Sequence, residues 1–260
     1  MRITTKVIAR ARLAEPVWPK VLVAVSDLHQ NSRGRHDNFQ AVLFQDFLRD
    51  QLKRYGSAFT LMILGNRRDN LEEPSGARIA RNNLLTDRMI ARIETEEVPG
   101  NHENVAGADR FLYYIARETL FAWHGDLLDL ACSGRGRLDR IGSAVWSVLE
   151  RVGLGGILGR VKDALQRAVQ RRRKTAARRE DDNQVYIEDA EKRIEQAVRA
   201  GLRGILLYLC GHTHVPELLE LAGGRVFGNC GSWTTPGRGY AIIVDGCDVS
   251  LAEVTGDETI

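Results

Sequence analysis

The sequence predicts an α/β protein in which a mixed β-sheet core is flanked by helices and interrupted by a helical insertion. Short apolar runs alternate with polar loops and amphipathic helices in the first half of the chain, a pattern typical of parallel strands joined by crossover helices. The stretch 127–200 is instead rich in Arg and Ala and has few strand signals. With 260 residues, 43% hydrophobic and 27% charged, the chain can bury a large core without disulfide bonds.

The first half of the chain supplies the alternating elements. The run Lys-Val-Leu-Val-Ala-Val-Ser at 20–26 is short, apolar and β-branched, as buried strands are. Phe39, Leu43 and Phe47 recur at helical spacing, so we expect a helix over 38–55 that Asp37 caps and Gly56 ends. By the same criteria we expect strands over 59–64 and 119–123, a short extended approach over 95–99, and helices over 77–93 and 106–116.

The Arg-rich stretch and the strands after it define the expected domain boundaries. We expect helices over 138–152, 157–177 and 186–200, and strands over 205–210, 225–227, 240–244 and 249–254. The close spacing of the later strands favours antiparallel pairing. We therefore predict an N-terminal extension over 1–19, an α/β domain made of 20–126 and 201–260, and a helical, Arg-rich insertion or cap over 127–200.

The composition excludes several classes of protein. The four cysteines are scattered without a Cys-x-x-Cys pair, which argues against a zinc knuckle and against a disulfide framework. No run of about eighteen apolar residues indicates a transmembrane helix. Residues 1–20 lack the unbroken apolar stretch of a secretory signal, so the expected location is the cytoplasm. The net charge of +3 excludes nothing by itself.

The histidines form the strongest chemical signal. Five of the six follow a predicted strand or lie just beyond a glycine: His29, His102, His124, His212 and His214. In Asp-x-His and His-x-His segments, two donors lie on the same side of an extended chain. Imidazole, carboxylate and carboxamide groups together suit a first-row divalent ion rather than a thiolate zinc site. A lone histidine is most often structural, but five at successive strand ends predict a metal site.

Five short motifs carry these residues in order along the chain. They are Asp27-Leu28-His29, Gly65-Asn66, Gly100-Asn101-His102-Glu103, His124-Gly125-Asp126 and Gly211-His212-Thr213-His214. Together they resemble the motifs of the calcineurin-like metallophosphoesterases, from about residue 20 to about residue 254. His124-Gly125-Asp126-x-x-Asp129, the basic insert, Gly-His-Thr-His-x-Pro and Asn229-Cys230-Gly231-Ser232-Trp233 are more loosely similar to the bacterial hydrolases that split UDP-2,3-diacylglucosamine.

The resemblance implies a site for two metal ions. One ion would be held by Asp27, His29 and His214, the other by Asn101, His124 and His212, and the residue at position 66, here Asn66, would bridge them. His102 occupies the position of a proton donor or phosphate-binding imidazole in this class, where the diacylglucosamine hydrolases more often have Arg. Mn²⁺ is the expected ion, with Fe, Zn and Mg as alternatives.

The implied reaction is hydrolysis of a phosphodiester or pyrophosphate bond. Two ions ~3.5–4 Å apart hold a bridging hydroxide that attacks phosphorus in line, and they stabilise both the attacking and the leaving oxygen. Water bound to such an ion loses several pKa units, so a nucleophile exists at neutral pH. The expected substrate is a small anionic phosphoester, and a UDP-sugar-like compound is the leading candidate.

Position 66 departs from the family pattern, because it is normally Asp and here is Asn66. A carboxamide brings no charge, so two mutually repelling dications lose an anionic bridge. Arg67 and Arg68 follow and add positive charge, while Asp69 is either a substitute anion or a solvated acid that pairs with an arginine. Two alternatives therefore stay open: a weakened or non-catalytic binding protein with this fold, and a serine/threonine phosphoprotein phosphatase.

The basic run Arg171-Arg172-Arg173-Lys174 has three interpretations. It is a solvated helix face, a clamp for an anionic substrate or for lipid head groups at a membrane surface, or a contact for nucleic-acid phosphates. The run lacks interleaved aromatic residues for base stacking, which argues against nucleic acid. We take these four residues as candidate substrate-binding groups.

Overall fold

The computed structural model describes most of the α/β core. The described residues are 3–30, 39–68, 76–100, 114–116, 119–125, 183–184, 186–192, 195, 199 and 204–256. The helices expected over 138–152 and 157–177 lie outside these ranges, as does the expected cap Asp37. The described residues of the helix expected over 186–200 are helical. Among the described residues, no helix is both long and apolar enough to span a membrane.

A six-stranded sheet forms one half of the core, in the order β1-β11-β10-β2-β3-β4. Its parallel part consists of β2 (Val21–Val25), β3 (Phe59–Leu64) and β4 (Glu94–Val98). The antiparallel part consists of β10 (Arg238–Asp245), β11 (Asp248–Gly256) and β1 (Ile3–Arg12). The sheet is therefore mixed, as the sequence predicts.

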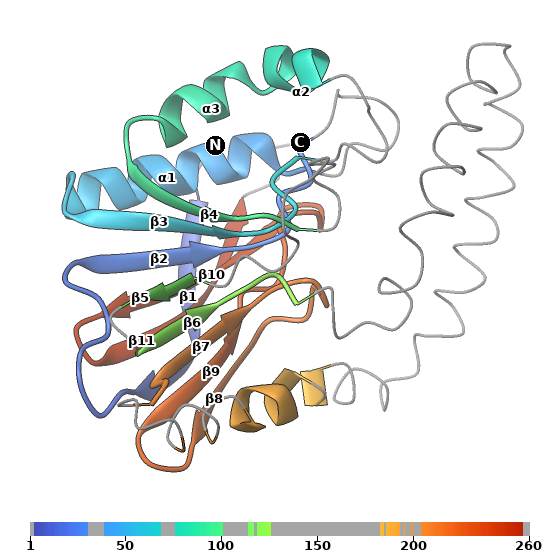
Figure 1. The fold of residues 1–260 in the computed structure, drawn as a ribbon. Coiled ribbons are helices and arrows are strands. Elements are labelled where there is room, and N and C mark those ends of the chain that lie inside the picture. Colours follow the sequence, from blue (N-terminus) through green and yellow to red (C-terminus); the bar gives the residue numbers. More distant parts are fainter. Residues whose placement is uncertain are drawn as a thin grey trace, which may run out of the picture.

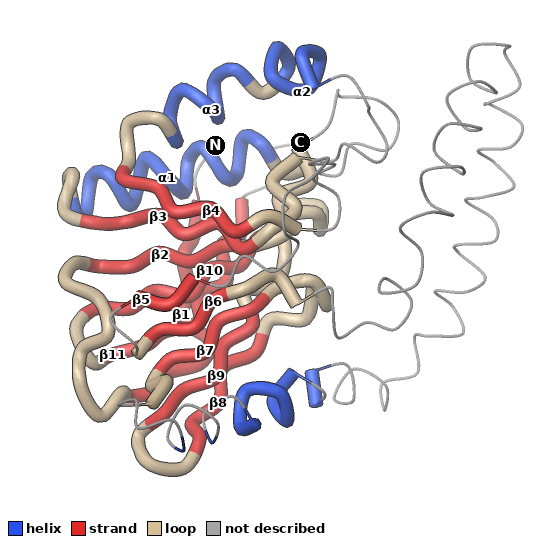
Figure 2. Tube along the Cα trace, in the orientation of Figure 1, coloured by secondary structure: helices blue, strands red, loops and turns tan. Residues whose placement is uncertain are grey.

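A five-stranded sheet forms the other half, in the order β5-β6-β7-β9-β8. Its parallel centre consists of β6 (Leu120–Ala122), β7 (Leu207–Cys210) and β9 (Arg225–Asn229). The edge strands β5 (Tyr114–Ala116) and β8 (Glu217–Leu221) are antiparallel to their neighbours. This second sheet is also mixed, and in Figure 2 the longer helices lie along one side of the stacked strands.

Three apolar clusters define the layers of the sandwich. Alternate residues of β2 point to opposite faces: Leu22 joins a cluster shared by both sheets, whereas Val23 joins the cluster under the helices. Helices α1 (Ala41–Tyr55) and α3 (Leu84–Ile90) cover that outer face of the six-stranded sheet (Figure 1). A third cluster covers the outer face of the five-stranded sheet and includes Tyr186 from the helical residues 186–192.

The N-terminal residues are part of the sheet, which corrects the expectation of an extension over 1–19. Ile3–Arg12 pairs along its length with β11 as an edge strand. Lys6, Arg10 and Arg12 are exposed on it, because an edge strand has one neighbour and little cover. The strand therefore lacks the apolar run by which the buried strands were recognised.

The helices also differ from the expectation in detail. The helix expected over 77–93 is two helices, α2 (Gly76–Asn82) and α3, separated at Asn83. The Asn83 side chain donates to the Ile79 carbonyl at 3.0 Å, and such side-chain bonds compete with a continuous helix. Tyr114–Ala116 is strand β5, so the end of the helix expected over 106–116 is wrong. Pairing with β6 has overridden the local helical pattern there.

Both ends of α1 are defined by the structure. The N-cap residue is Gln40, three residues after the expected cap Asp37, and it makes no side-chain capping bond. Gly56 ends the helix as predicted, with φ 60°, and its N–H donates to the Leu52 carbonyl.

A buried tryptophan connects α1 to the loop that follows β2. Trp233 is fully buried, and its ring lies 4.8 Å from Phe44 and 5.2 Å from Phe47 between centroids. Its backbone N–H donates to the Asp27 carbonyl, and its own carbonyl accepts from the Gln40 N–H. The Gly-Ser-Trp segment after β9 therefore packs directly behind the loop that carries Asp27.

Substituting Gly239→Ala should destabilise the protein by about 1–3 kcal/mol, the usual cost of overpacking a core. A Cβ at Gly239 would lie 2.3–2.5 Å from three ring atoms of Trp233, which has no space to move between the phenylalanines. Chemical unfolding monitored by tryptophan fluorescence measures the effect. Gly246→Ala, where a Cβ meets nothing within 4 Å, should cost only the backbone preference at φ 59°. Equal losses would show that Gly239 is not tightly packed.

Candidate metal centre

The candidate site lies where parallel strands of both sheets end. Asp27 and His29 follow β2 and Asn66 follows β3, whereas His124 follows β6 and His212 and His214 follow β7. The carboxyl ends of parallel strands meet at one edge of an α/β core, which is where ligands bind in such folds. Residues from both halves of the chain are thereby brought together.

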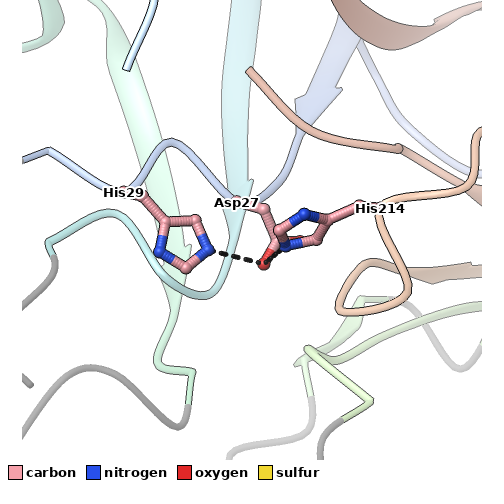
Figure 3. A group of neighbouring side chains, drawn as sticks. All are labelled: Asp27, His29 and His214. Atoms are coloured by element: carbon pink, nitrogen blue, oxygen red, sulfur yellow. Dashed lines mark hydrogen bonds and ion pairs between the residues drawn. The ribbon is translucent and has the colours of Figure 1, made fainter. Parts of the chain in front are cut away.

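Asp27 is the centre of the cluster and is fully buried. Its Oδ1 lies 3.4 Å from His29 Nε2 and 3.2 Å from His214 Nε2, and it accepts a hydrogen bond from Asn66 Nδ2 at 3.0 Å. Its Oδ2 accepts from the His212 backbone N–H at 2.8 Å and from the Ser26 hydroxyl. Figure 3 shows His29 and His214 approaching the carboxylate from opposite sides.

A second pair of imidazoles lies beside this carboxylate. His124 Nδ1 lies 2.9 Å from the Leu64 carbonyl, and a carbonyl only accepts, so Nδ1 carries the proton. His124 Nε2 then carries no proton, and it lies 3.2 Å from His212 Nδ1 and 4.0 Å from Asp27 Oδ1. Asp27 Oδ1 therefore faces both groups of histidines.

The donor set and its spacing fit a divalent ion. The ligand atoms of Asp27, His29 and His214 all lie within 4.8 Å of one another. Neighbouring ligands on an ion with bonds of about 2.1 Å lie roughly 3.0–3.4 Å apart, in octahedral or tetrahedral geometry. The separations of Asp27 Oδ1 from the two imidazole nitrogens, 3.4 and 3.2 Å, match that range. Mixed carboxylate and imidazole ligands suit Mn, Fe or Zn.

The charges of the cluster favour ligation at neutral pH. Burial raises the pKa of Asp27, but charge interactions with His214 and His124 and hydrogen bonds from His214 and His29 outweigh it, so the pKa is well below its usual value. Burial lowers the pKa of His124 to about 4, against an opposing rise from Asp27. Asp27 is therefore an anion and His124 a neutral imidazole at pH 7. Both are in the protonation states that metal binding requires.

The backbone of the site adopts a conformation that most residues avoid. Among the described residues, the non-glycine residues with positive φ are Asp27, His29, Asn66, His212 and His214, with φ from 49° to 70°. All are residues that the sequence motifs select. Left-handed backbone is tolerated best by Asn, Asp and His, and persists where the surroundings over-determine it. Strain of this kind concentrates at functional sites.

Two glycines allow the loops to approach this closely. A Cβ at Gly211 would lie 1.7 Å from Ser26 Oγ and 2.8 Å from Asp27 Oδ2. A Cβ at Gly65 would lie 2.3 Å from His124 Nδ1. Neither position can accept a side chain without moving a residue of the site.

The arginines after Asn66 are paired with acids. Arg67 forms ion pairs with Asp87 at 2.8 Å and with Glu97, and Arg68 lies 3.7 Å from Asp87. The carboxylates of α3 and β4 therefore offset the positive charge that the sequence leads one to expect beside the metal site. Asn66 itself is 2% exposed and keeps its contact with Asp27.

Several predicted site residues lie outside the described part of the chain. They are Asn101, His102 and Asp69, and the basic residues Arg171, Arg172, Arg173 and Lys174. The structure brings together the remaining predicted ligands, Asp27, His29, Asn66, His124, His212 and His214. It also adds Ser26, whose hydroxyl donates to Asp27 and which the sequence did not single out because it lies outside the motifs.

Acidification from pH 6.5 to 4 should destabilise the metal-free protein. Unfolded His124 takes up a proton near its ordinary pKa of 6.5, whereas in the folded protein its pKa is about 4. The unfolded state then binds more protons, so the free energy of unfolding falls as pH falls, by at most ~1.4 kcal/mol per pH unit. The lowered pKa of Asp27 acts in the same direction but mainly at lower pH, because unfolded Asp27 takes up its proton near 3.8. Urea unfolding in chelator measures the slope, and an unchanged slope in His124→Gln would assign the effect elsewhere.

Comparison with known proteins finds only distant structural similarity. No protein-family model matches the sequence, and no curated protein matches it. The chain is similar to Vps29 from Chaetomium thermophilum, with 12% identity, coverage of 90% of this chain and 97% of that one, and a TM-score of 0.43. A dimetal phosphatase from Danio rerio is 13% identical, with coverage of 90% of this chain and 98% of that one and a TM-score of 0.46. A metallophosphoesterase from Sphaerobacter thermophilus is 15% identical, with coverage of 90% of this chain and 87% of that one and a TM-score of 0.36.

Two of these three proteins are named as a dimetal phosphatase and a metallophosphoesterase. A UDP-2,3-diacylglucosamine hydrolase is not among the three. At these identities and TM-scores the similarities decide nothing about activity, which has to be argued from the residues of this chain.

Proposed function

We propose that this protein is a metal-dependent hydrolase of phosphoesters. The observation that supports this most strongly is the buried Asp27 carboxylate, whose Oδ1 lies 3.2–4.0 Å from imidazole nitrogens of His214, His29 and His124. A buried carboxylate surrounded by imidazoles is a ligand set for a divalent ion. Phosphoester hydrolysis is a reaction in which such ions act, because they acidify water and neutralise charge on phosphoryl oxygens.

In this proposal the site holds two ions. Asp27, His29 and His214 hold one, and His124, His212 and Asn101 hold the other, with Asn66 between them. The position of Asp27 Oδ1 supports a place for this atom between the two proposed ions, because it faces both groups of histidines. The roles of Asn101 as a ligand and of His102 as a proton donor rest on the motif resemblance alone.

The chain itself contributes ligand placement and charge. The His212 N–H and the Ser26 hydroxyl hold Asp27 Oδ2, which leaves Oδ1 for the histidine side of the cluster. The Leu64 carbonyl fixes the His124 ring so that Nε2 points inward. These contacts set the ligands in place before an ion binds, which reduces the cost of ordering them.

The proposal extends to the ion, the substrate, the role of the basic residues and the location of the protein. The preferred ion is Mn²⁺, with Fe, Zn and Mg as alternatives, and the substrate is a small anionic phosphodiester or pyrophosphate such as a UDP-sugar. Arg171, Arg172, Arg173 and Lys174 are proposed to bind the anionic substrate or a lipid head group. The proposed location is the cytoplasm.

One observation favours a second candidate, a metal-poor binding protein. Asn66 donates a hydrogen bond to Asp27 Oδ1, the atom that the ions would share. The bridging position is thus neutral, and among the described residues of the cluster Asp27 is the only carboxylate. Two dications held by one anion repel strongly, so the second ion is the weaker one.

Chelation should abolish hydrolysis of a generic phosphodiester, and added Mn²⁺ should restore it. The apolar clusters of the two sheets do not include the expected ligands, so a chelator should remove ions without unfolding the core. Elemental analysis gives ions per chain: about two supports the enzyme, and none in excess Mn²⁺ supports the binding protein. Asp27→Asn, which removes the charge and keeps the shape, should stay inactive with Mn²⁺. Full activity of metal-free protein in chelator would rule the mechanism out.

Asn66→Asp should have opposite effects on the metal-free and the metal-bound protein. Without ions it places a second carboxylate 3.0 Å from Asp27 Oδ1, and like charges in a buried site lower stability at pH 7. With Mn²⁺ it supplies the anionic bridge, so occupancy of the weaker site and kcat should both rise. Unfolding in chelator, metal titration and initial rates at matched Mn²⁺ measure the three effects.

Asn83→Asp is the matched control, because Asn83 is also a buried asparagine but its amide donates to the Ile79 carbonyl. It should lose stability with and without Mn²⁺ and gain no affinity. If Asn66→Asp behaves like this control, position 66 does not bridge the ions.

A further inference from the structure

A buried polar network joins the helical residues 183–184 and 186–192 to the loop that carries two of the histidines. Asn183 is fully buried. Its Oδ1 accepts hydrogen bonds from Thr213 Oγ1 at 2.9 Å and from Asn229 Nδ2 at 3.0 Å, and its Nδ2 donates to the Val215 carbonyl at 3.2 Å. One side chain therefore satisfies groups on two different segments of the chain.

Thr213 is the residue between His212 and His214, and it is held from several directions. Its hydroxyl donates to Asn183 Oδ1 and accepts from the Val215 N–H at 3.2 Å and from Asn229 Nδ2 at 2.9 Å. Asn229 Nδ2 also lies 3.1 Å from the Gly211 carbonyl. Both histidines have left-handed backbone, with φ 70° and 60°, so this loop needs external contacts to keep its shape.

The helical residues are anchored independently of Asn183. Asp189 accepts a hydrogen bond from the Tyr208 hydroxyl at 2.8 Å, and Tyr186 and Ala190 pack in the outer cluster of the five-stranded sheet. Tyr186 also lies so close to Gly125 that a Cβ there would be 2.6 Å from its ring. Gly125 directly follows His124. The helical residues thus contact the site loops at Gly125, next to His124, and at Thr213, next to His214.

We propose that Asn183 is a positioning residue for the metal centre, which holds the 211–214 loop so that His212 and His214 face Asp27. The proposal rests on the proposed function, since it concerns the ligands of that site. Groups that orient metal ligands through one intervening contact typically change metal affinity about 10–100-fold when removed. Asn183 acts through the Thr213 hydroxyl and not through a direct contact with a ligand.

The test compares Mn²⁺ affinity in the full-length wild type and three variants, by titration calorimetry with electron paramagnetic resonance of free Mn²⁺ as a second readout. Asn183→Ala and Thr213→Val should each weaken the affinity about tenfold. The double variant should be little worse than either, because both remove the same contact. Thr213→Val keeps the branched shape and remains informative if Asn183→Ala folds poorly.

Tyr208→Phe is the matched control, because it removes the hydrogen bond to Asp189 of the helical residues and leaves the Asn183 contacts in place. It should lower metal-free stability but change Mn²⁺ affinity less than twofold. Unchanged affinity in Asn183→Ala, or an equal loss in Tyr208→Phe at matched stability, would overturn the positioning role and leave the proposed function intact. Absence of Mn²⁺ binding in the wild type would overturn both.

Discussion

A single buried carboxylate holds together loops that come from both sheets. The Asp27 carboxylate accepts hydrogen bonds from its own loop, from Asn66 after β3 and from His212 and His214 after β7. Its backbone carbonyl accepts a hydrogen bond from the Trp233 N–H. A carboxylate with no exposure is costly unless its charge is compensated. The neighbours provide that compensation in the metal-free protein. Binding an ion then exchanges one set of partners for another, and the ligands are already assembled.

The same arrangement limits how much positive charge the site can hold. Asn66 contributes a dipole and no charge, and the nearby arginines are paired with Asp87 and Glu97, so they neither help nor strongly oppose a cation. Charge balance therefore depends chiefly on Asp27 within the described part of the cluster. The metal-free protein is more stable as a result, because two adjacent carboxylates would repel each other. A second ion in the proposed site would bind more weakly, because one anion would have to offset two dications.

The buried strands and the residues that follow them could be predicted from the sequence, because both signals are local. The apolar run of β3 is buried throughout and that of β2 from Leu22 onward, and the polar residues after them lie at the expected edge of the sheet. The edge strands β1 and β8 could not, since exposed charges such as Lys6 and Glu220 interrupt any apolar pattern.

The sequence also could not predict two contacts, the pairing of Arg67 with Asp87 and the contact of Asn183 with Thr213. Each joins residues that are distant in sequence, and no local pattern reports which acid or which amide lies near. Asn66 illustrates the converse. Its unusual identity is visible in the sequence, but only the structure shows that its amide donates to Asp27.

The pairing of β1 with β11 has a consequence for how the chain folds during synthesis. Ile3 lies opposite Gly256, so the strand made first finds its partner only when the last strand of the sheet has been made. Contacts between such distant segments form late, because closing a long loop costs entropy before the favourable free energy of strand pairing offsets that cost. Until then β1 lacks its partner strand. Its lysine and arginines disfavour pairing of this exposed strand with strands of other molecules.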